Sequence, residues 1–226
     1  MEKIYTIPVN DAFDVQDGCP FCRLYKMLEE NELDIILGAA MMEPDIRIQT
    51  NKKGFCKEHY EKMFTCKNRL GLALMLESHI DEVVSKLEKP PIFADKLKNA
   101  GEFLGEGSKS CYICERIDNN FGKMVECACI LWETDEKFRE KFAKTPMFCV
   151  SHYSRLLTAA QTFVSKKARG DFYAAASKIE NEYLKTLKED VSWFCKKFDY
   201  RYDNEPWGNS KDAVERAIKS MYHEKK

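Results

Sequence analysis

The chain has 226 residues and a formal net charge of −1 at pH 7, with 36 Lys and Arg against 37 Asp and Glu. Hydrophobic residues make up 44% of the sequence, so a folded core is expected, and the balanced charge excludes a protein that coats nucleic acid or membrane through bulk electrostatics. Its ten cysteines, about 4% of the residues, are too few for a small disulfide scaffold and need another explanation.

The N-terminal segment lacks the apolar core of a signal peptide, and no stretch reaches the roughly 18 apolar residues of a membrane-spanning helix. We therefore expect a soluble protein of the reducing cytoplasm. In that compartment, cysteines at short spacings bind metals or take part in redox chemistry more often than they form crosslinks.

The first part of the chain, 1–90, is predicted to form a helical hairpin. Apolar residues at near-helical spacing predict a helix that follows Cys22 and ends before Pro44. Ile46 and Ile48 then alternate with polar residues, which predicts a short strand or extended loop closed by Gly54. A long helix is expected over 56–87.

The remaining chain is predicted to repeat this plan after a linker. Residues 91–107 contain proline and glycine and are expected to form a linker with a short helix at about 94–104. A second helical unit should occupy 108–200, and an aromatic loop and a final helix capped by Ser210 should occupy 201–226. The predicted fold is thus mainly α-helical.

Eight Cys and His residues form a pattern that occurs twice. A Cys-x-x-Cys pair precedes a Cys-x-x-His pair in each copy, and corresponding positions are separated by 92, 92, 93 and 93 residues. The aromatic residues Phe55 and Tyr60 of the first copy correspond to Phe148 and Tyr153 of the second. This spacing favours an internal repeat.

Each copy supplies three thiols and one imidazole, the ligand set of a closed tetrahedral zinc site. The sequence therefore predicts two Zn²⁺ ions per chain, each holding its own helical unit closed. Because protein side chains fill all four positions, a structural role for the metal is expected and no catalytic residue is assigned. The predicted ligands are Cys19, Cys22, Cys56 and His59 in the first unit and Cys111, Cys114, Cys149 and His152 in the second.

The other cysteines and histidines have no predicted function. Cys127 and Cys129 point in different directions from one helix, and Cys195 lies in an aromatic context, so they are expected to pack in the core. For Cys66, a place in the core is favoured over a role as an exchangeable extra metal ligand. No functional role is expected for His79 or His223.

The motifs CPFC, GFCKEHY and PWGNSKDAVERAI resemble those of an uncharacterised family of bacterial proteins, chiefly from Clostridia and relatives. The resemblance extends over essentially the whole chain and implies a bacterial cytoplasmic setting. It implies no activity, substrate or catalytic residue. We expect Trp207, in the last of these motifs, to pack as a plug against one end of a helical bundle.

The primary hypothesis is a zinc-stabilised binding or regulatory module with an unknown protein partner. One alternative is a thiol redox protein or sensor that uses the Cys-x-x-Cys pairs, although no βαβ pattern surrounds Cys19 and Cys22. Another is an iron–sulfur protein with Cys₃His ligation. Nucleic-acid binding is not favoured, because each basic cluster has acidic neighbours.

Overall fold

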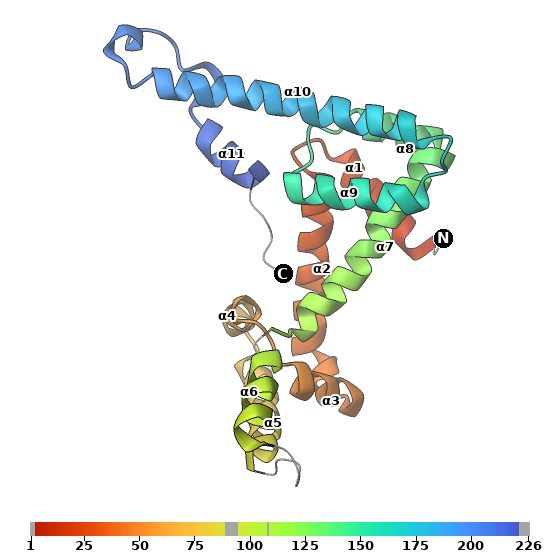
Figure 1. The fold of residues 1–226 in the computed structure, drawn as a ribbon, viewed down its shortest axis with the longest axis vertical. Coiled ribbons are helices and arrows are strands. Elements are labelled where there is room, and N and C mark those ends of the chain that lie inside the picture. The colour runs from red at the N-terminus through yellow and green to blue at the C-terminus, as the bar shows by residue number, and fades with distance from the viewer. Residues whose placement is uncertain (1–2, 89–94, 108, 222–226) are drawn as a thin grey trace. The chain divides into compact units, whose positions relative to one another are not determined.

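The structure is a computed structural model that describes residues 3–88, 95–107 and 109–221. Within these ranges the chain forms eleven α-helices and four short 3₁₀ helices and contains no β-strand (Figure 1). The mainly α-helical fold predicted from the sequence is confirmed. No helix of the described ranges has the length and apolar character needed to cross a membrane.

The chain divides into two compact units that are not consecutive in sequence. Residues 1–26 and 121–226 form one, here called the split unit, and residues 27–120 form the other, the central unit. Both boundaries fall inside helices, one in α2 (Pro20–Leu37) and one in α7 (Tyr112–Thr134). This division differs from the consecutive units expected at 1–90 and 108–200, because α2 and α7 are continuous helices that each belong in part to both units.

The split unit is built around a cluster of buried phenylalanines. Phe13 packs against Phe21 with ring centroids 5.5 Å apart, and Trp132 meets Phe172 edge to face at 4.9 Å. Besides parts of α2 and α7, its helices are α1 (Thr6–Asp14), α8 (Glu136–Ala143), α9 (Val150–Phe163), α10 (Arg169–Lys196) and α11 (Ala213–Met221). The fully buried rings are those of Phe13, Phe21, Phe121, Phe138, Phe142, Phe148 and Phe172.

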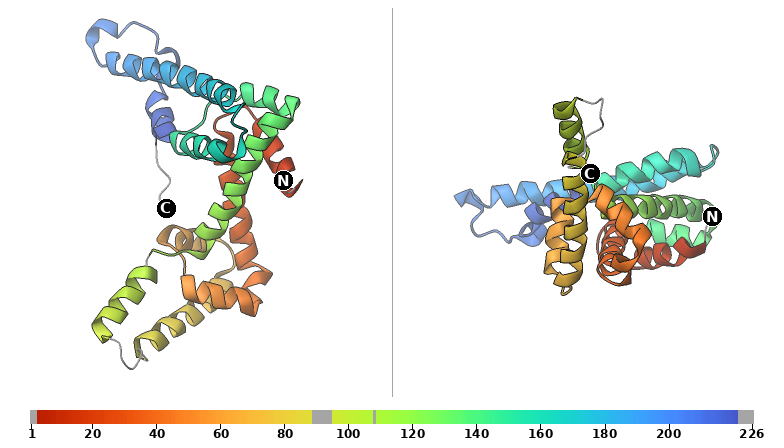
Figure 2. Two further views of the ribbon diagram at one scale, coloured as in Figure 1. Left: turned by 45° about the vertical axis from the view of Figure 1, so that its right-hand side comes forward. Right: turned by 90° about the horizontal axis from the view of Figure 1, so that it is seen from below.

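The central unit has a smaller core than the split unit, and its helices can be followed by their colours in Figure 2. Helix α3 packs against α5, and α4 also contacts α5, whereas α6 buries no residue. Its helices, besides parts of α2 and α7, are α3 (Pro44–Lys53), α4 (Lys57–Thr65), α5 (Arg69–Glu88) and α6 (Lys96–Gly107).

The strand or extended loop predicted around Ile46 and Ile48 was wrong, because these residues lie in α3. Pro44 occupies the start of this helix, and Gly54 ends it with a positive φ of 61°. Lys52 and Lys53 lie in the last turn, where basic side chains interact favourably with the helix dipole. These end signals outweighed a short alternation of apolar residues.

The single helix predicted over 56–87 was also wrong, because the chain leaves the helical conformation between α4 and α5. Cys66 is extended, with a ψ of 153°. The side-chain oxygen of Asn68 then accepts a hydrogen bond from the Gly71 N–H at 2.9 Å, as a helix N-cap does. The short helix expected at about 94–104 within the linker is present as α6 (Lys96–Gly107), and residues 91–94 of the linker lie outside the described ranges.

The loop that contains Trp207 folds back on the C-terminal end of α10. The ring of Trp207 lies 5.8 Å from that of Phe194, and the indole N–H of Trp193 donates to the Pro206 carbonyl at 3.0 Å. The Lys197 ammonium group is buried beneath the loop and donates to three of its carbonyl groups, those of Tyr202, Asp203 and Glu205.

Candidate metal centres

All four Cys/His pairs lie at the beginning of a helix, as the sequence predicted. Cys19 and Cys22 begin α2, and Cys111 and Cys114 begin α7. Cys56 and Cys149 are the N-caps of α4 and α9, with nearly identical extended backbones (ψ 162° and 152°). His59 and His152 follow one turn into these two helices. Thiolates are stabilised at such positions by the partial positive charge of the helix N-terminus.

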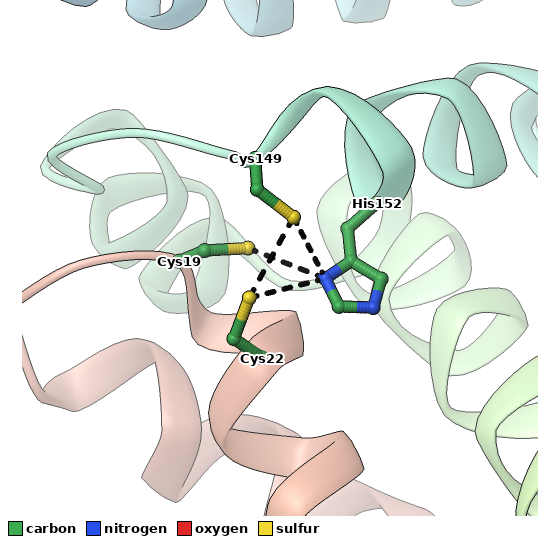
Figure 3. Close-up of side chains that lie close together, drawn as sticks. All are labelled: Cys19, Cys22, Cys149 and His152. Carbon is green, nitrogen blue, oxygen red and sulfur yellow. Dashed lines mark hydrogen bonds between the residues drawn. The ribbon is translucent and has the colours of Figure 1, made fainter. Parts of the chain in front are cut away.

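The first group of ligands lies in the split unit and combines Cys19 and Cys22 with Cys149 and His152 (Figure 3). The Nδ1 atom of His152 lies 3.7 Å from the Sγ atom of Cys19, 3.3 Å from that of Cys22 and 3.1 Å from that of Cys149. The Sγ atoms of Cys22 and Cys149 are 3.6 Å apart. Three sulfurs and one nitrogen therefore point to a common centre.

The second group lies in the central unit and combines Cys56 and His59 with Cys111 and Cys114. The Nδ1 atom of His59 lies 3.2 Å from the Sγ atom of Cys56 and 3.3 Å from each of the other two sulfurs. The Sγ atoms of Cys56 and Cys114 are 3.8 Å apart. The same nitrogen of the imidazole ring faces the sulfurs in both groups.

These distances fit the edges of a tetrahedron around one metal ion. With metal–sulfur and metal–nitrogen bonds of about 2.3 and 2.0 Å, tetrahedral angles give sulfur–sulfur edges of about 3.8 Å and sulfur–nitrogen edges of about 3.5 Å. The separations of 3.1–3.8 Å in the structure lie within about half an ångström of these values. The sulfur atoms are also much farther apart than the bond of about 2.0 Å in a disulfide. Both groups therefore fit a metal-binding helical protein.

The predicted assignment of ligands to two consecutive units was wrong. The structure brings all eight residues together in groups of four, but each Cys-x-x-Cys pair meets the Cys-x-x-His pair of the other copy. The inner two pairs form one group and the outer two form the other. Helix α2 contributes to this, because its 18 residues span about 27 Å and carry the chain away from Cys19 and Cys22 before it reaches Cys56.

Aromatic rings surround the ligands of the first group. The ring of Phe121 lies 4.9 Å from the imidazole of His152, and that of Phe21 lies 6.2 Å from it. The carboxylate of Glu180, on α10, accepts a hydrogen bond from the Phe148 N–H at 3.1 Å and so fixes the backbone next to Cys149. Burial raises the pKa of Glu180 to about 7.

Charged residues surround the second group. The Nε2 atom of His59 lies 3.3 Å from a carboxylate oxygen of Glu29, which also accepts a hydrogen bond from Lys62 at 2.6 Å. One turn further along α2, the buried carboxylate of Glu32 accepts a hydrogen bond from Arg116 at 2.5 Å. Carboxylates that bind the outer nitrogen of a ligating histidine orient its ring and strengthen metal binding.

Glu29, Glu32 and Glu180 were not predicted from the sequence. A signal was present in two cases, since Glu32 interrupts the apolar face formed by Leu28 and Ile36 on α2. Glu180 similarly follows Phe172 and Ala176 at intervals of four residues on the buried face of α10. A carboxylate at an apolar position of a helix needs a buried partner, and here the partners lie next to metal-ligand residues.

Without a metal, the ligands of each group share protons. Hydrogen bonding by Cys114 lowers the pKa of the Cys111 thiol to about 3, despite burial. Burial opposes a charge on His59, but Cys111 and Glu29 outweigh it and raise the pKa of His59 to about 10. At Cys19, hydrogen bonds with Cys149 and Cys22 overcome burial and lower the pKa as well. In each group, hydrogen bonding among the ligands thus favours the thiolate form of one cysteine, the form that binds a cation.

The remaining cysteines lie apart from these groups. Cys127 and Cys129 are buried as predicted, and Cys66 is half-buried at the end of α4. Cys195 is exposed, so its predicted place in the core was wrong. The ring of His79 makes a hydrogen bond with the Asn51 carbonyl at 2.7 Å and thus connects α5 to α3. His223 lies outside the described residues.

Comparison with known proteins identifies a family for the chain. The model of a family of unknown function, DUF6062, matches residues 1–226, which is the whole chain. No curated protein and no solved structure matches the chain significantly. The comparisons thus confirm the resemblance to an uncharacterised family and supply no activity.

Proposed function

The chain belongs to DUF6062, a family of unknown function, and we propose that it is a zinc protein in which two structural Cys₃His sites shape a binding or regulatory module. The observation that carries this proposal is the convergence of six sulfurs and two imidazole nitrogens into two tetrahedral sets. Each ion would hold two helix starts together that are far apart in sequence. Metal binding would therefore contribute directly to the free energy of folding.

The ligand set favours a structural site over a catalytic one. Catalytic zinc keeps one coordination position for water or substrate, whereas protein side chains can fill all four positions here. When bound, zinc would neutralise the thiolates and crosslink the helices without changing its oxidation state. Hydrolysis at either site is therefore not part of the proposal.

Two features support zinc over an iron–sulfur cluster. The four ligand atoms of each group lie within 4.8 Å of one another and converge on one point, whereas a four-iron cluster binds each ligand to a different iron atom and so requires them farther apart. Three thiolates and one imidazole in a tetrahedral arrangement also form a common structural zinc site.

The geometry gives less support to a thiol oxidoreductase. A catalytic cysteine must be accessible to its substrate, but the two thiols with lowered pKa, Cys19 and Cys111, are only 7% and 8% exposed. Both also lie within bonding reach of a common metal centre.

Metal analysis of the protein purified under anaerobic conditions tests the proposal. We expect a colourless protein with about two zinc ions per chain, one for each group. A brown protein that contains iron and acid-labile sulfide would show that the groups bind an iron–sulfur cluster instead of zinc. A folded protein without bound metal would refute both assignments.

A further inference from the structure

The two ligand groups differ in their access to solvent. In the first group, Cys149 and His152 are 2% and 0% exposed, and Cys22 is the one ligand that is not buried. In the second group, both Cys56 and Cys114 are only half-buried. A chelator or an exchanging thiol in solution can therefore reach two sulfurs of the second group.

The helices that carry the histidines also differ in how firmly they are packed. Helix α9 has 14 residues and buries Leu156 and Ala160 in addition to His152. Helix α4 has nine residues, and Met63 is the only residue besides His59 that it buries. A helix of this length is not stable alone in water, so α4 depends on its few tertiary contacts and, when a metal is bound, on its two ligands.

Glu29 of α2 makes polar contacts with two residues of α4. One of its carboxylate oxygens lies near His59 Nε2 and Lys62 Nζ, and these two residues occupy successive turns of α4. The other ring nitrogen of His59, Nδ1, faces the three sulfurs. Loss of the contacts with Glu29 would free the helix that carries two of the four ligands.

From these differences we propose that the second group is an exchangeable metal site that opens by release of α4, and that Glu29 is the residue that positions His59 for metal binding. The first group would keep its metal as a permanent part of the phenylalanine core. This inference rests on the proposed metal-binding function and adds the order in which the two groups release their metals. Metal availability would then control the fold of the central unit while the split unit stays intact.

Chelator challenge of the metal-loaded full chain tests the order of release. The protein is incubated with EDTA, native mass spectrometry counts the bound metals, and iodoacetamide marks each thiol that becomes free. We expect a one-metal species in which Cys56, Cys111 and Cys114 are alkylated while Cys19, Cys22 and Cys149 are protected. Alkylation of the first group before the second, or simultaneous loss of both metals, would overturn the inference.

The role of Glu29 is tested with Glu29→Gln, which keeps the shape of the side chain and removes its charge. Because partners of ligating histidines change metal affinity about 10–100-fold, we expect at least about tenfold faster release from the second group and no change at the first. Glu58→Gln is the matched control, since Glu58 also accepts a hydrogen bond from Lys62. Equal release rates for Glu29→Gln and the unmodified protein would refute the assignment.

A spectroscopic measurement separates positioning from general stability. In the protein loaded with Co²⁺, Glu29→Gln should alter the ligand-field spectrum of one of the two ions, and Glu29→Asp should partly restore it. An unchanged spectrum would argue against positioning of His59. A protein that binds no metal at all would instead refute the proposed function itself.

Discussion

The Sγ atom of Cys22 lies 3.6 Å from that of Cys149, although 127 positions separate the two residues in the sequence. The second group closes a shorter segment of chain inside this one, with Cys56 and Cys114 separated by 58 positions. Two nested crosslinks of this kind close longer loops than two consecutive crosslinks would. They therefore restrict the unfolded chain more, because each doubling of loop length adds about 0.6 kcal/mol to the entropic cost of closing the loop. Metal binding and the topology of the chain are therefore coupled.

Glu180 should make stability depend on pH. Burial raises its pKa from 4.5 to about 7, so the folded protein retains this proton over a range in which the unfolded chain has lost it. The free energy of unfolding should therefore decrease as pH rises from about 4.5 to about 7, with the loss complete above that range.

Glu180→Gln should remove this dependence and stabilise the protein by about 1–3 kcal/mol at pH 8, because an amide cannot ionise. Denaturant unfolding at several pH values, with metal content verified, measures the effect. Glu182→Gln is the control, since Glu182 is exposed on the same helix. Parallel pH profiles for Glu180→Gln and the unmodified protein would contradict the prediction.

The cysteines outside the metal groups should differ strongly in reactivity. Cys195 is exposed, whereas burial raises the pKa of the Cys127 thiol and raises that of Cys129 to about 12. In the metal-loaded protein, iodoacetamide should therefore modify Cys195 first and reach Cys127 and Cys129 only after unfolding. Cys195→Ser should abolish the fast phase. Modification of Cys129 as fast as that of Cys195 would show that the packing described for α7 is wrong.

Lys197 should organise the loop that contains Trp207. Its ammonium group donates to the carbonyls of Asp203 at 3.0 Å and Glu205 at 2.8 Å and lies 5.4 Å from the Trp207 ring centroid. Since a hydrogen bond from a charged group contributes about 1.5–3 kcal/mol, Lys197→Met should speed amide hydrogen exchange in the loop about tenfold or more.

The exposed neighbour Lys196 provides the matched control, Lys196→Met, which should leave exchange in this loop unchanged. Both variants should keep their full metal content, because the loop is not part of either ligand group. Equal exchange rates in the two variants would show that Lys197 does not organise the loop that contains Trp207.

Much of the fold could be predicted from local sequence patterns. Apolar spacing identified the helical class and most of the long helices, and α2 indeed begins beside Cys22. The errors arose where a local signal was misread, as at Pro44 and Gly54, which delimit α3, and at Asn68, which caps α5. The amino-acid composition gives no indication that the boundaries between the two units fall inside α2 and α7.

The candidate ligands could also be predicted, but their grouping could not. Cys and His spacing identified four pairs, each able to supply two ligands to one ion. Which pairs meet depends on the length and direction of the helices between them, and the spacing within each pair contains no information about that. Duplicated motifs make the ambiguity worse, because each Cys-x-x-Cys pair is chemically equivalent toward either Cys-x-x-His pair.

Metal content of two double variants tests the nested pairing most directly. In Cys22→Ser/Cys149→Ser both substitutions fall in one group, so about one metal per chain should remain, whereas Cys22→Ser/Cys56→Ser damages both groups and should leave almost none. Each variant is desalted with a weak competing chelator and measured by elemental analysis against the folded, unmodified protein. The reverse result, with one metal retained in Cys22→Ser/Cys56→Ser and none in Cys22→Ser/Cys149→Ser, would contradict the account and restore the consecutive pairing.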